Sequence, residues 1–151
     1  MSSTSQLTDF SETDLAWSAG FVDGEGCIAL CKHAQKIKGV EYRCFVLRLS
    51  VTNTDLRCLE RLKSMFGGSI NQANHKGREH HKPCWTWYCT SAKAERALIA
   101  LLPFLFSKKE QAELGIASRR YIQSNGRPRT ADSIAGQEHA YTQLRHLKRV
   151  A

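Results

Sequence analysis

The sequence lacks any apolar segment long enough to span a membrane, and its first residues lack the apolar core of a secretion signal. The longest apolar run, ALIALLPFLF at residues 97–106, contains Pro103 and is shorter than the roughly 18 apolar residues that a membrane-spanning helix requires. The first ten residues, MSSTSQLTDF, are mostly polar. We therefore expect an intracellular protein, either in a bacterial cytoplasm or in the matrix of a chloroplast or mitochondrion.

Acidic residues are scarce relative to basic ones. The 151-residue chain has 14 Asp and Glu against 22 Lys and Arg, which gives a formal net charge of +8. The basic residues are spread along the chain rather than gathered in one tail. This balance favours a polyanionic partner, nucleic acid first and an anionic membrane surface second. Charge alone also fits a basic globular protein without such a partner.

The chain also lacks a recognisable disulfide or zinc pattern, although it has six cysteines. Most of them lie inside apolar strand or helix patterns, which is typical of buried reduced thiols in an intracellular protein. Their spacing with nearby histidines fits none of the usual structural zinc sites. A basic hairpin that reaches along DNA is the favoured interpretation of this segment, and a zinc-dependent hydrolase is a distant alternative. The residues concerned are His75, His80, His81, Cys84 and Cys89.

The spacing of apolar residues predicts an α+β fold. The first seven predicted elements follow the order αββαββα, and two αββ units indicate one four-stranded antiparallel sheet with helices on a single face. We expect a flexible arm at residues 1–11, a core at 12–123, and a basic C-terminal loop and helix at 124–151. Helices are predicted at about residues 12–22, 54–66 with its cap, 91–102, 108–123 and 132–149, and strands at about 26–34, 41–52, 69–74 and 84–90.

Several element ends carry their own signals. Ser11 is predicted to cap the first helix, and the GEG triplet at residues 24–26 is predicted to end it near Val22. Ser91 is predicted to cap the third helix and Pro103 to end or kink it. In the last helix the residues expected to face inward are Ile134, Tyr141, Leu144 and Leu147.

The second predicted strand alternates between two kinds of side chain. Phe45, Leu47, Leu49 and Val51 point to one face, and residues 44, 46, 48 and 50 point to the other. We expect the uncovered face of the sheet to be polar and basic. Such a face can lie in the major groove of DNA, although a plain solvated face is the alternative. The residues expected there are Lys32, Arg43 or Arg48, Ser50, Gln72 and an aromatic side chain from Trp85 to Tyr88.

The stretch LAWSAGFVDGEG places small residues on one helix face and acids at the helix end. Ala16, Ala19 and Gly20 leave a face without bulk, which allows a second helix to approach closely or simply serves core packing. Asp23 and Glu25 stand at the negative pole of the helix dipole, where carboxylates are unfavourable. Together with a terminal carbonyl such as that of Gly24, they form an oxygen-rich site that suits Mg²⁺ or Ca²⁺.

The sequence SAGFVDGEG resembles the LAGLIDADG motif, and the order of elements over about residues 12–123 is similar to that of LAGLIDADG homing endonucleases. The motif occurs once, as in the homodimeric members, so the resemblance implies that two motif helices pack together through Ala16, Ala19 and Gly20. It also implies that Glu25 binds the metal with the carbonyl of Gly24, and that Asp23 has a more structural role. Members commonly have Asp at the position of Glu25, so the longer side chain alters the ligand geometry.

Two further segments resemble catalytic segments of that family. VTNTDLR implies that Asn53 and Arg57 lie beside the metal, and LLPFLFSKKEQA implies a pocket lysine, Lys108 before Lys109. With Glu25, these residues form the expected catalytic set. The implied cofactor is Mg²⁺, with Ca²⁺ or Mn²⁺ as substitutes, and no other small-molecule cofactor is expected.

The resemblance implies a homodimer that hydrolyses both strands of a long, near-palindromic DNA target and leaves staggered ends. A non-cleaving RNA maturase or DNA-binding regulator on the same scaffold is the alternative. The loop NGRPRT at residues 125–130 adds two arginines that contact the phosphate backbone or remain solvated. The expected DNA-binding residues are Lys32, Lys36, Lys38, Arg43, Arg48, Ser50, Gln72, Lys76, Arg78, Lys82, Arg127 and Arg129.

Overall fold

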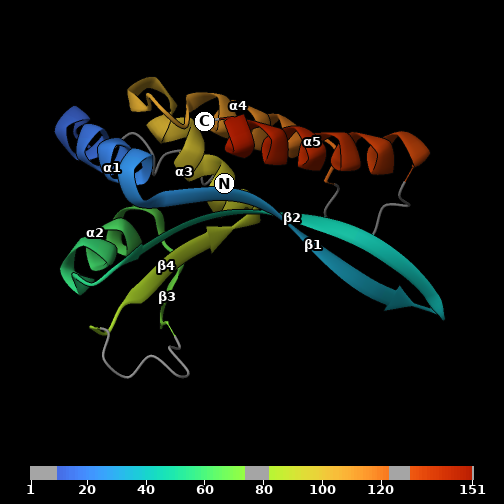
Figure 1. Ribbon diagram of the computed structural model, residues 1–151, viewed down its shortest axis with the longest axis horizontal. Coiled ribbons are helices and arrows are strands. Elements are labelled where there is room, and N and C mark those ends of the chain that lie inside the picture. The colour runs from blue at the N-terminus through green and yellow to red at the C-terminus, as the bar shows by residue number, and fades with distance from the viewer. Residues whose placement is uncertain (1–9, 74–81, 123–129, 151) are drawn as a thin grey trace, which may run out of the picture.

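A four-stranded antiparallel sheet in the order β1-β2-β4-β3 carries the fold, and helices cover one of its faces (Figure 1). The computed structural model describes residues 10–73, 82–122 and 130–150. The first seven elements follow the predicted order αββαββα, so the predicted α+β fold is confirmed. The elements are α1 (Glu12–Glu25), β1 (Gly26–Ile37), β2 (Val40–Asn53), α2 (Leu56–Phe66), β3 (Ser69–Gln72), β4 (Trp85–Thr90), α3 (Ser91–Leu101), the short 3₁₀ helix η1 (Leu102–Phe104), α4 (Lys109–Ser118) and α5 (Ala131–Val150).

The helix α1 is one turn longer than predicted. Ser11 caps its start as expected, because the Ser11 hydroxyl accepts a hydrogen bond from the Asp14 amide at 3.1 Å. The prediction that the helix stops near Val22 is wrong, since it continues through Glu25. A side chain at Gly24 would meet open space, whereas a Cβ at Gly26 would lie 2.6 Å from the Val22 carbonyl oxygen. Position 26 therefore requires glycine, and both acids belong to the last turn of the helix, which ends at Glu25.

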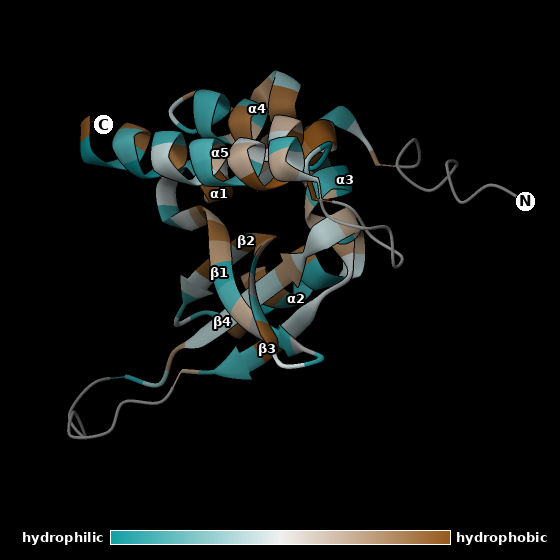
Figure 2. Ribbon diagram, turned by 90° about the vertical axis from the view of Figure 1, so that its right-hand side faces the viewer, coloured by the Kyte–Doolittle hydropathy of each residue, from teal (hydrophilic) through white to brown (hydrophobic). Residues whose placement is uncertain are grey.

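The core lies between the sheet and the helices (Figure 2). β1 pairs with β2 along the whole length of β1, from Gly26 opposite Val51 to Ile37 opposite Val40. The predicted inward face of β2 is confirmed, since its four apolar side chains are buried. Trp87 of β4 extends this core toward α2, because its indole N–H donates to the Gly67 carbonyl at 2.8 Å. Among the described residues, no helix is both long and apolar enough to cross a membrane.

The helix α5 presents a different face to the core than the sequence pattern indicated. Ile134 is 40% exposed, so its predicted inward position is wrong. Two polar residues take the buried positions because both donate to the Tyr121 carbonyl, Ser133 at 2.6 Å and Gln137 at 2.8 Å. Leu144 is buried as predicted.

Other helix ends also differ from the predictions. Ser91 does not cap α3, because it has a positive φ of 54° inside the helix and Thr90 is the residue before it. The helix α4 begins at Lys109 and ends at Ser118, and is therefore shorter than the predicted 108–123. Pro103 ends α3 as expected, since it lies in η1.

Candidate active site and nucleic-acid interface

The C-terminal end of α1 is held against the segment that leads into α4. The Asp23 carboxylate accepts hydrogen bonds from the backbone amides of Phe106 at 2.8 Å and Lys108 at 3.0 Å, and from the Ser107 hydroxyl at 3.2 Å. Desolvation by burial raises the pKa of Asp23, but these hydrogen bonds outweigh it, so its pKa lies below the usual 3.8. Asp23 is therefore an anchor for residues 106–108.

Lys108 is the lysine that lies beside this helix end. Its ammonium Nζ donates to the Asp23 carbonyl oxygen at 2.5 Å. A cation is favourable there because the C-terminal carbonyls of a helix carry partial negative charge. Lys109, the second candidate, is exposed at the first position of α4. The geometry thus favours Lys108 over Lys109 as the pocket lysine.

Glu25 and Gly24 are exposed in the last turn of α1. A carboxylate and adjoining backbone carbonyls are the all-oxygen donors that Mg²⁺ or Ca²⁺ prefers. Within residues 10–73, 82–122 and 130–150, no group of three or more His, Cys, Asp or Glu residues could hold a metal ion. The donors of one chain fit a hard divalent cation in kind, but they form only part of a coordination sphere.

Asn53 and Arg57 lie at and just beyond the end of β2. Because Gly26 pairs with Val51, the antiparallel register brings Asn53 to the end of the sheet where α1 stops. The Asn53 amide oxygen accepts from the Asp55 amide at 2.7 Å. The Arg57 guanidinium binds the Asp55 carboxylate at 3.0 and 2.8 Å, and its side chain is 88% exposed. The described structure brings Asn53 near the helix end but does not join Arg57 to Glu25 or Lys108.

The exposed small-residue face of α1 differs from the predicted one. Ala16 and Gly20 are exposed, and a Cβ added at Gly20 or at Gly24 would meet no other atom within 4 Å. Spaced four residues apart, Ala16, Gly20 and Gly24 follow one side of the helix. Ala19 is fully buried in the chain's own core, so its predicted place at a dimer interface is wrong.

One residue at this end was missed by the sequence reasoning. Phe106 is 91% exposed although it is aromatic, and its backbone amide is bound by Asp23. The signal available in the sequence was an aromatic residue placed directly before Ser107 and the two lysines. Large exposed apolar side chains are often found at interaction surfaces.

Strand register corrects the predicted membership of the open face. Side chains of paired residues share a face, and Lys32 pairs with the buried Phe45, so Lys32 lies on the helix side. There its ammonium lies 3.7 Å from Glu138 and 5.5 Å from the centre of the Tyr141 ring. Arg43 lies on the same side, 4.0 Å from Glu138. A one-residue change of register reverses the face of every side chain, and the sequence left the register of β1 undetermined.

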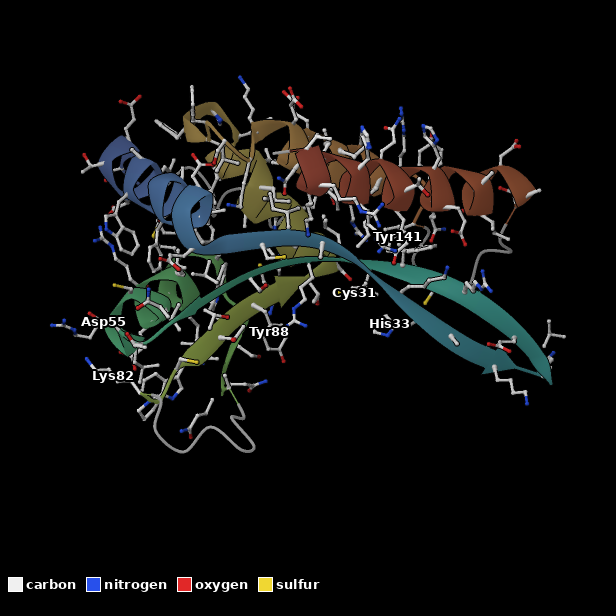
Figure 3. The ribbon with its side chains drawn as sticks, in the orientation of Figure 1. Cys31, His33, Asp55, Lys82, Tyr88 and Tyr141 are labelled. Atoms are coloured by element: carbon white, nitrogen blue, oxygen red, sulfur yellow. The ribbon has the colours of Figure 1, made fainter. Side chains whose placement is uncertain are left out.

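The strands β3 and β4 follow the same rule. Gln72 pairs with Trp85, which shares the face of the buried Trp87, so Gln72 does not belong to the open face. Tyr88 has the opposite orientation. Figure 3 shows Tyr88 on the side of the sheet away from the helices, and Tyr141 between α5 and the sheet.

The open face, defined by the register, is mostly neutral. Arg48 and Ser50 lie on it as predicted, and Ser50 pairs with Tyr88. The hydroxyls of Thr52 and Thr86 hydrogen-bond each other at 2.8 Å. Its other described members are Cys27, Ala29, Cys31, His33, Val40, Cys44, Val46, Ser69, Asn71 and Thr90.

The remaining predicted DNA contacts lie at the margins or outside the described residues. Lys36 belongs to β1 rather than to a turn, Lys38 forms the turn after it with a φ of 49°, and Lys82 is exposed just before β4. Lys76, Arg78, Arg127 and Arg129 lie outside the described residues, as do His75, His80 and His81 of the rejected zinc pattern.

Burial raises the pKa of the Cys89 thiol to about 12, so this cysteine stays protonated at neutral pH.

Comparisons with known proteins complete the description of the site. The family model described as LAGLIDADG endonuclease matches residues 18–109, more than half of the chain. The homing endonuclease I-CvuI, in complex with a DNA target, superposes with a TM-score of 0.75 at 19% identity over 90% of this chain and 82% of its own. The archaeal intron-encoded homing endonuclease I-Vdi141I, complexed with DNA, superposes with a TM-score of 0.71 at 16% identity over 90% of this chain and 84% of its own.

A third structure differs in length. I-SmaMI, bound to an uncleaved DNA target in the presence of calcium ions, has a TM-score of 0.63 at 21% identity over 91% of this chain but only 48% of its own. This chain therefore spans about half of that protein. Comparison with curated protein sequences gives no match.

Proposed function

Because the chain belongs to the LAGLIDADG endonuclease family, we propose that it is a site-specific homing endonuclease that cuts both strands of DNA as a homodimer. The observation that carries this proposal is the arrangement at the end of α1. Glu25 is exposed there, and Lys108 is held at the same helix end through the Asp23 carbonyl. An acid and a lysine held at one helix end are the groups that metal-dependent phosphodiester hydrolysis requires.

The reaction is the hydrolysis of a phosphodiester bond by water. Glu25 and the Gly24 carbonyl would hold Mg²⁺, for which Ca²⁺ or Mn²⁺ are possible substitutes. When bound, a divalent ion lowers the pKa of a coordinated water and offsets charge on the phosphate oxygens. Lys108 adds a positive charge fixed in position, which stabilises the charge that develops on the phosphate. The Asn53 amide, at the same end of the sheet, is able to orient a water molecule, and the exposed Arg57 reaches the phosphate if it leaves Asp55.

Dimerisation would complete the site. One chain offers a single exposed carboxylate at this place, whereas two chains joined through α1 would bring two Glu25 side chains to the symmetry axis. Ala16, Gly20 and Gly24 leave room for such a close helix contact. The match to about half of I-SmaMI supports this arrangement, because two copies of this chain would equal that protein in length. Two-fold symmetry then requires a palindromic or near-palindromic target.

The open face of the sheet would bind the DNA. No helix of the described chain covers this face. A curved antiparallel sheet can fit a major groove. The solved structures named above are DNA complexes, which supports duplex DNA as the substrate. The net charge of +8 provides the long-range attraction to the phosphate backbone.

The test uses the DNA that flanks this reading frame, joined as it would be without the insertion. Incubation of the full chain with this duplex and Mg²⁺ is expected to give a double-strand cut with staggered ends, and a chelator is expected to prevent it. Intact binding without any cut, or stimulated splicing of the host RNA, would instead support the maturase or regulator.

A further inference from the structure

We propose that Arg48 reads one guanine in each half of the DNA target, held in position by the ring of Tyr88. This inference rests on the proposed DNA-cleaving function, because it assigns a base-reading role on the face that would contact the duplex. It concerns target choice and not the hydrolytic step.

Arg48 lies in the middle of the open face. It is flanked across the strands by two small residues, Ala29 on β1 and Thr90 on β4. At the strand positions of the described chain whose side chains point to this face, Arg48 is the single Lys or Arg. A lone cation at the centre of a neutral surface is poorly suited to nonspecific phosphate attraction, for which many cations are used.

The guanidinium is fixed by stacking and not by an acid. Its Cζ atom lies 4.5 Å from the centre of the Tyr88 ring, and such a contact leaves the edge of the planar group free. Four other arginines of the described chain have carboxylate partners: Arg43 with Glu138, Arg57 with Asp55, Arg61 with Asp14, and Arg119 with Glu95. Arg48 has no carboxylate partner of this kind, and its buried Nε lacks a hydrogen-bond acceptor among the described residues. Buried donors without a partner are uncommon in folded proteins, and each one calls for a physical explanation.

The neighbouring polar groups are already engaged with one another. Thr52 and Thr86 share a hydrogen bond, and the Asn71 amide donates to the Tyr88 hydroxyl at 3.5 Å. Asn71 thereby supports the ring on which Arg48 stacks. Arg48 is thus the group of this cluster with a donor that no described residue engages.

The chemistry of the free edge selects guanine. In the major groove guanine offers two acceptors, O6 and N7, and the parallel donors of a guanidinium match this pair. Adenine presents one acceptor and one donor, so its amino group would face an arginine donor without a partner. One good bidentate contact discriminates against the wrong base by about fivefold to about a hundredfold.

The test is selection of bound duplexes from a pool with randomised sequence, using the full-length chain with Ca²⁺ and then with Mg²⁺. Wild-type protein is expected to enrich a two-fold symmetric motif that contains guanine at one symmetric pair of positions. Arg48→Gln is expected to lose guanine at that pair by about fivefold or more, with the other positions unchanged. Tyr88→Leu is expected to weaken the same preference, and Tyr88→Phe to keep it because the ring remains.

Arg96→Gln is the matched control, because it removes the same charge from the exposed surface of α3. It should leave the selected motif unchanged. An Arg48→Lys protein, which keeps the charge, guards against misfolding of the Gln variant and should bind with reduced guanine preference. An unaltered motif for Arg48→Gln would overturn the role of Arg48 alone, whereas the absence of any motif for wild-type protein would overturn the DNA-cleaving function together with it.

Discussion

Replacing Asp23 by alanine tests whether its carboxylate holds the α1 end to the segment before α4. The substitution removes the acceptor for two backbone amides and one hydroxyl, at 2.8, 3.0 and 3.2 Å. Hydrogen bonds to charged acceptors contribute about 1.5–3 kcal/mol each, but partly exposed capping contacts contribute about 0.5–2 kcal/mol. Because Asp23 is partly exposed, we expect a total loss of about 2 kcal/mol in the free energy of unfolding.

Urea or thermal denaturation at one fixed protein concentration measures this loss. For a chain of this size a loss of about 2 kcal/mol lowers Tm by about 4–8 °C. Asp23→Asn is the matched variant, because it keeps one acceptor oxygen and loses the charge, and we expect about half of the effect. Cleavage is also expected to fall by about tenfold, since the Lys108 backbone is no longer held.

The pH dependence gives an independent check. The folded-state pKa of Asp23 lies below its usual value of 3.8, so the carboxylate stabilises the fold above pH 3.8. This contribution is lost as the pH falls through the folded-state pKa. The stability difference between wild type and Asp23→Asn should therefore be complete at neutral pH and shrink below about pH 4. Equal stability of wild type, Asp23→Ala and Asp23→Asn at pH 7 would refute the anchoring role.

Three further predictions address the metal site, the lysine and the dimer. Glu25→Gln should reduce cleavage by at least about a hundredfold. Duplex binding, measured by gel shift, should stay within a few fold of wild type. A mutant that cuts at the wild-type rate would show that the catalytic assignment is wrong. Lys108→Met should reduce the single-turnover cleavage rate by about a hundredfold, whereas Lys109→Met should leave it nearly unchanged. A large loss for Lys109→Met and none for Lys108→Met would make Lys109 the pocket lysine. Ala16→Leu or Gly20→Leu should give a monomer by light scattering. The control Ala92→Leu, on the exposed surface of α3, should remain a dimer. A normal dimer in all three variants would contradict packing through α1.

The order of elements could be predicted from the sequence because each element carries its own signal. The alternation from Phe45 to Val51 marks a strand with one buried face, and Ser11 marks the start of α1 by its side-chain chemistry. These features depend on a few neighbouring residues. The same locality explains why the helix end was misplaced: position 26 requires a residue without a Cβ because it lies close to the Val22 carbonyl, and this closeness arises only in the folded turn.

The composition of the open face could be predicted only for β2. Its alternation is unambiguous, so Arg48 and Ser50 were placed correctly. The face of Lys32 and Gln72 depends on which residues of β2 and β4 they pair with, and pairing across strands is set by tertiary contacts. Lys32 shows why charge misled the prediction: the Tyr141 and Phe45 rings and Glu138 accommodate this cation on the covered side.

The acids at the end of α1 require separate explanations. From the sequence, Asp23 and Glu25 together indicated a bound cation, because both face the negative end of a helix dipole. The structure gives Asp23 another partner, since the backbone amides of Phe106 and Lys108 donate hydrogen bonds to its carboxylate and the Lys108 ammonium binds its carbonyl. Only Glu25 remains exposed to the dipole without such partners in the described chain, so the electrostatic argument for a metal ion concerns Glu25 alone. A divalent ion and a second chain would supply to Glu25 the partners that the segment before α4 supplies to Asp23. Because the partners of Asp23 belong to its own fold, Asp23 variants should lower stability. Because the partners of Glu25 belong to the reaction, Glu25 variants should lower cleavage.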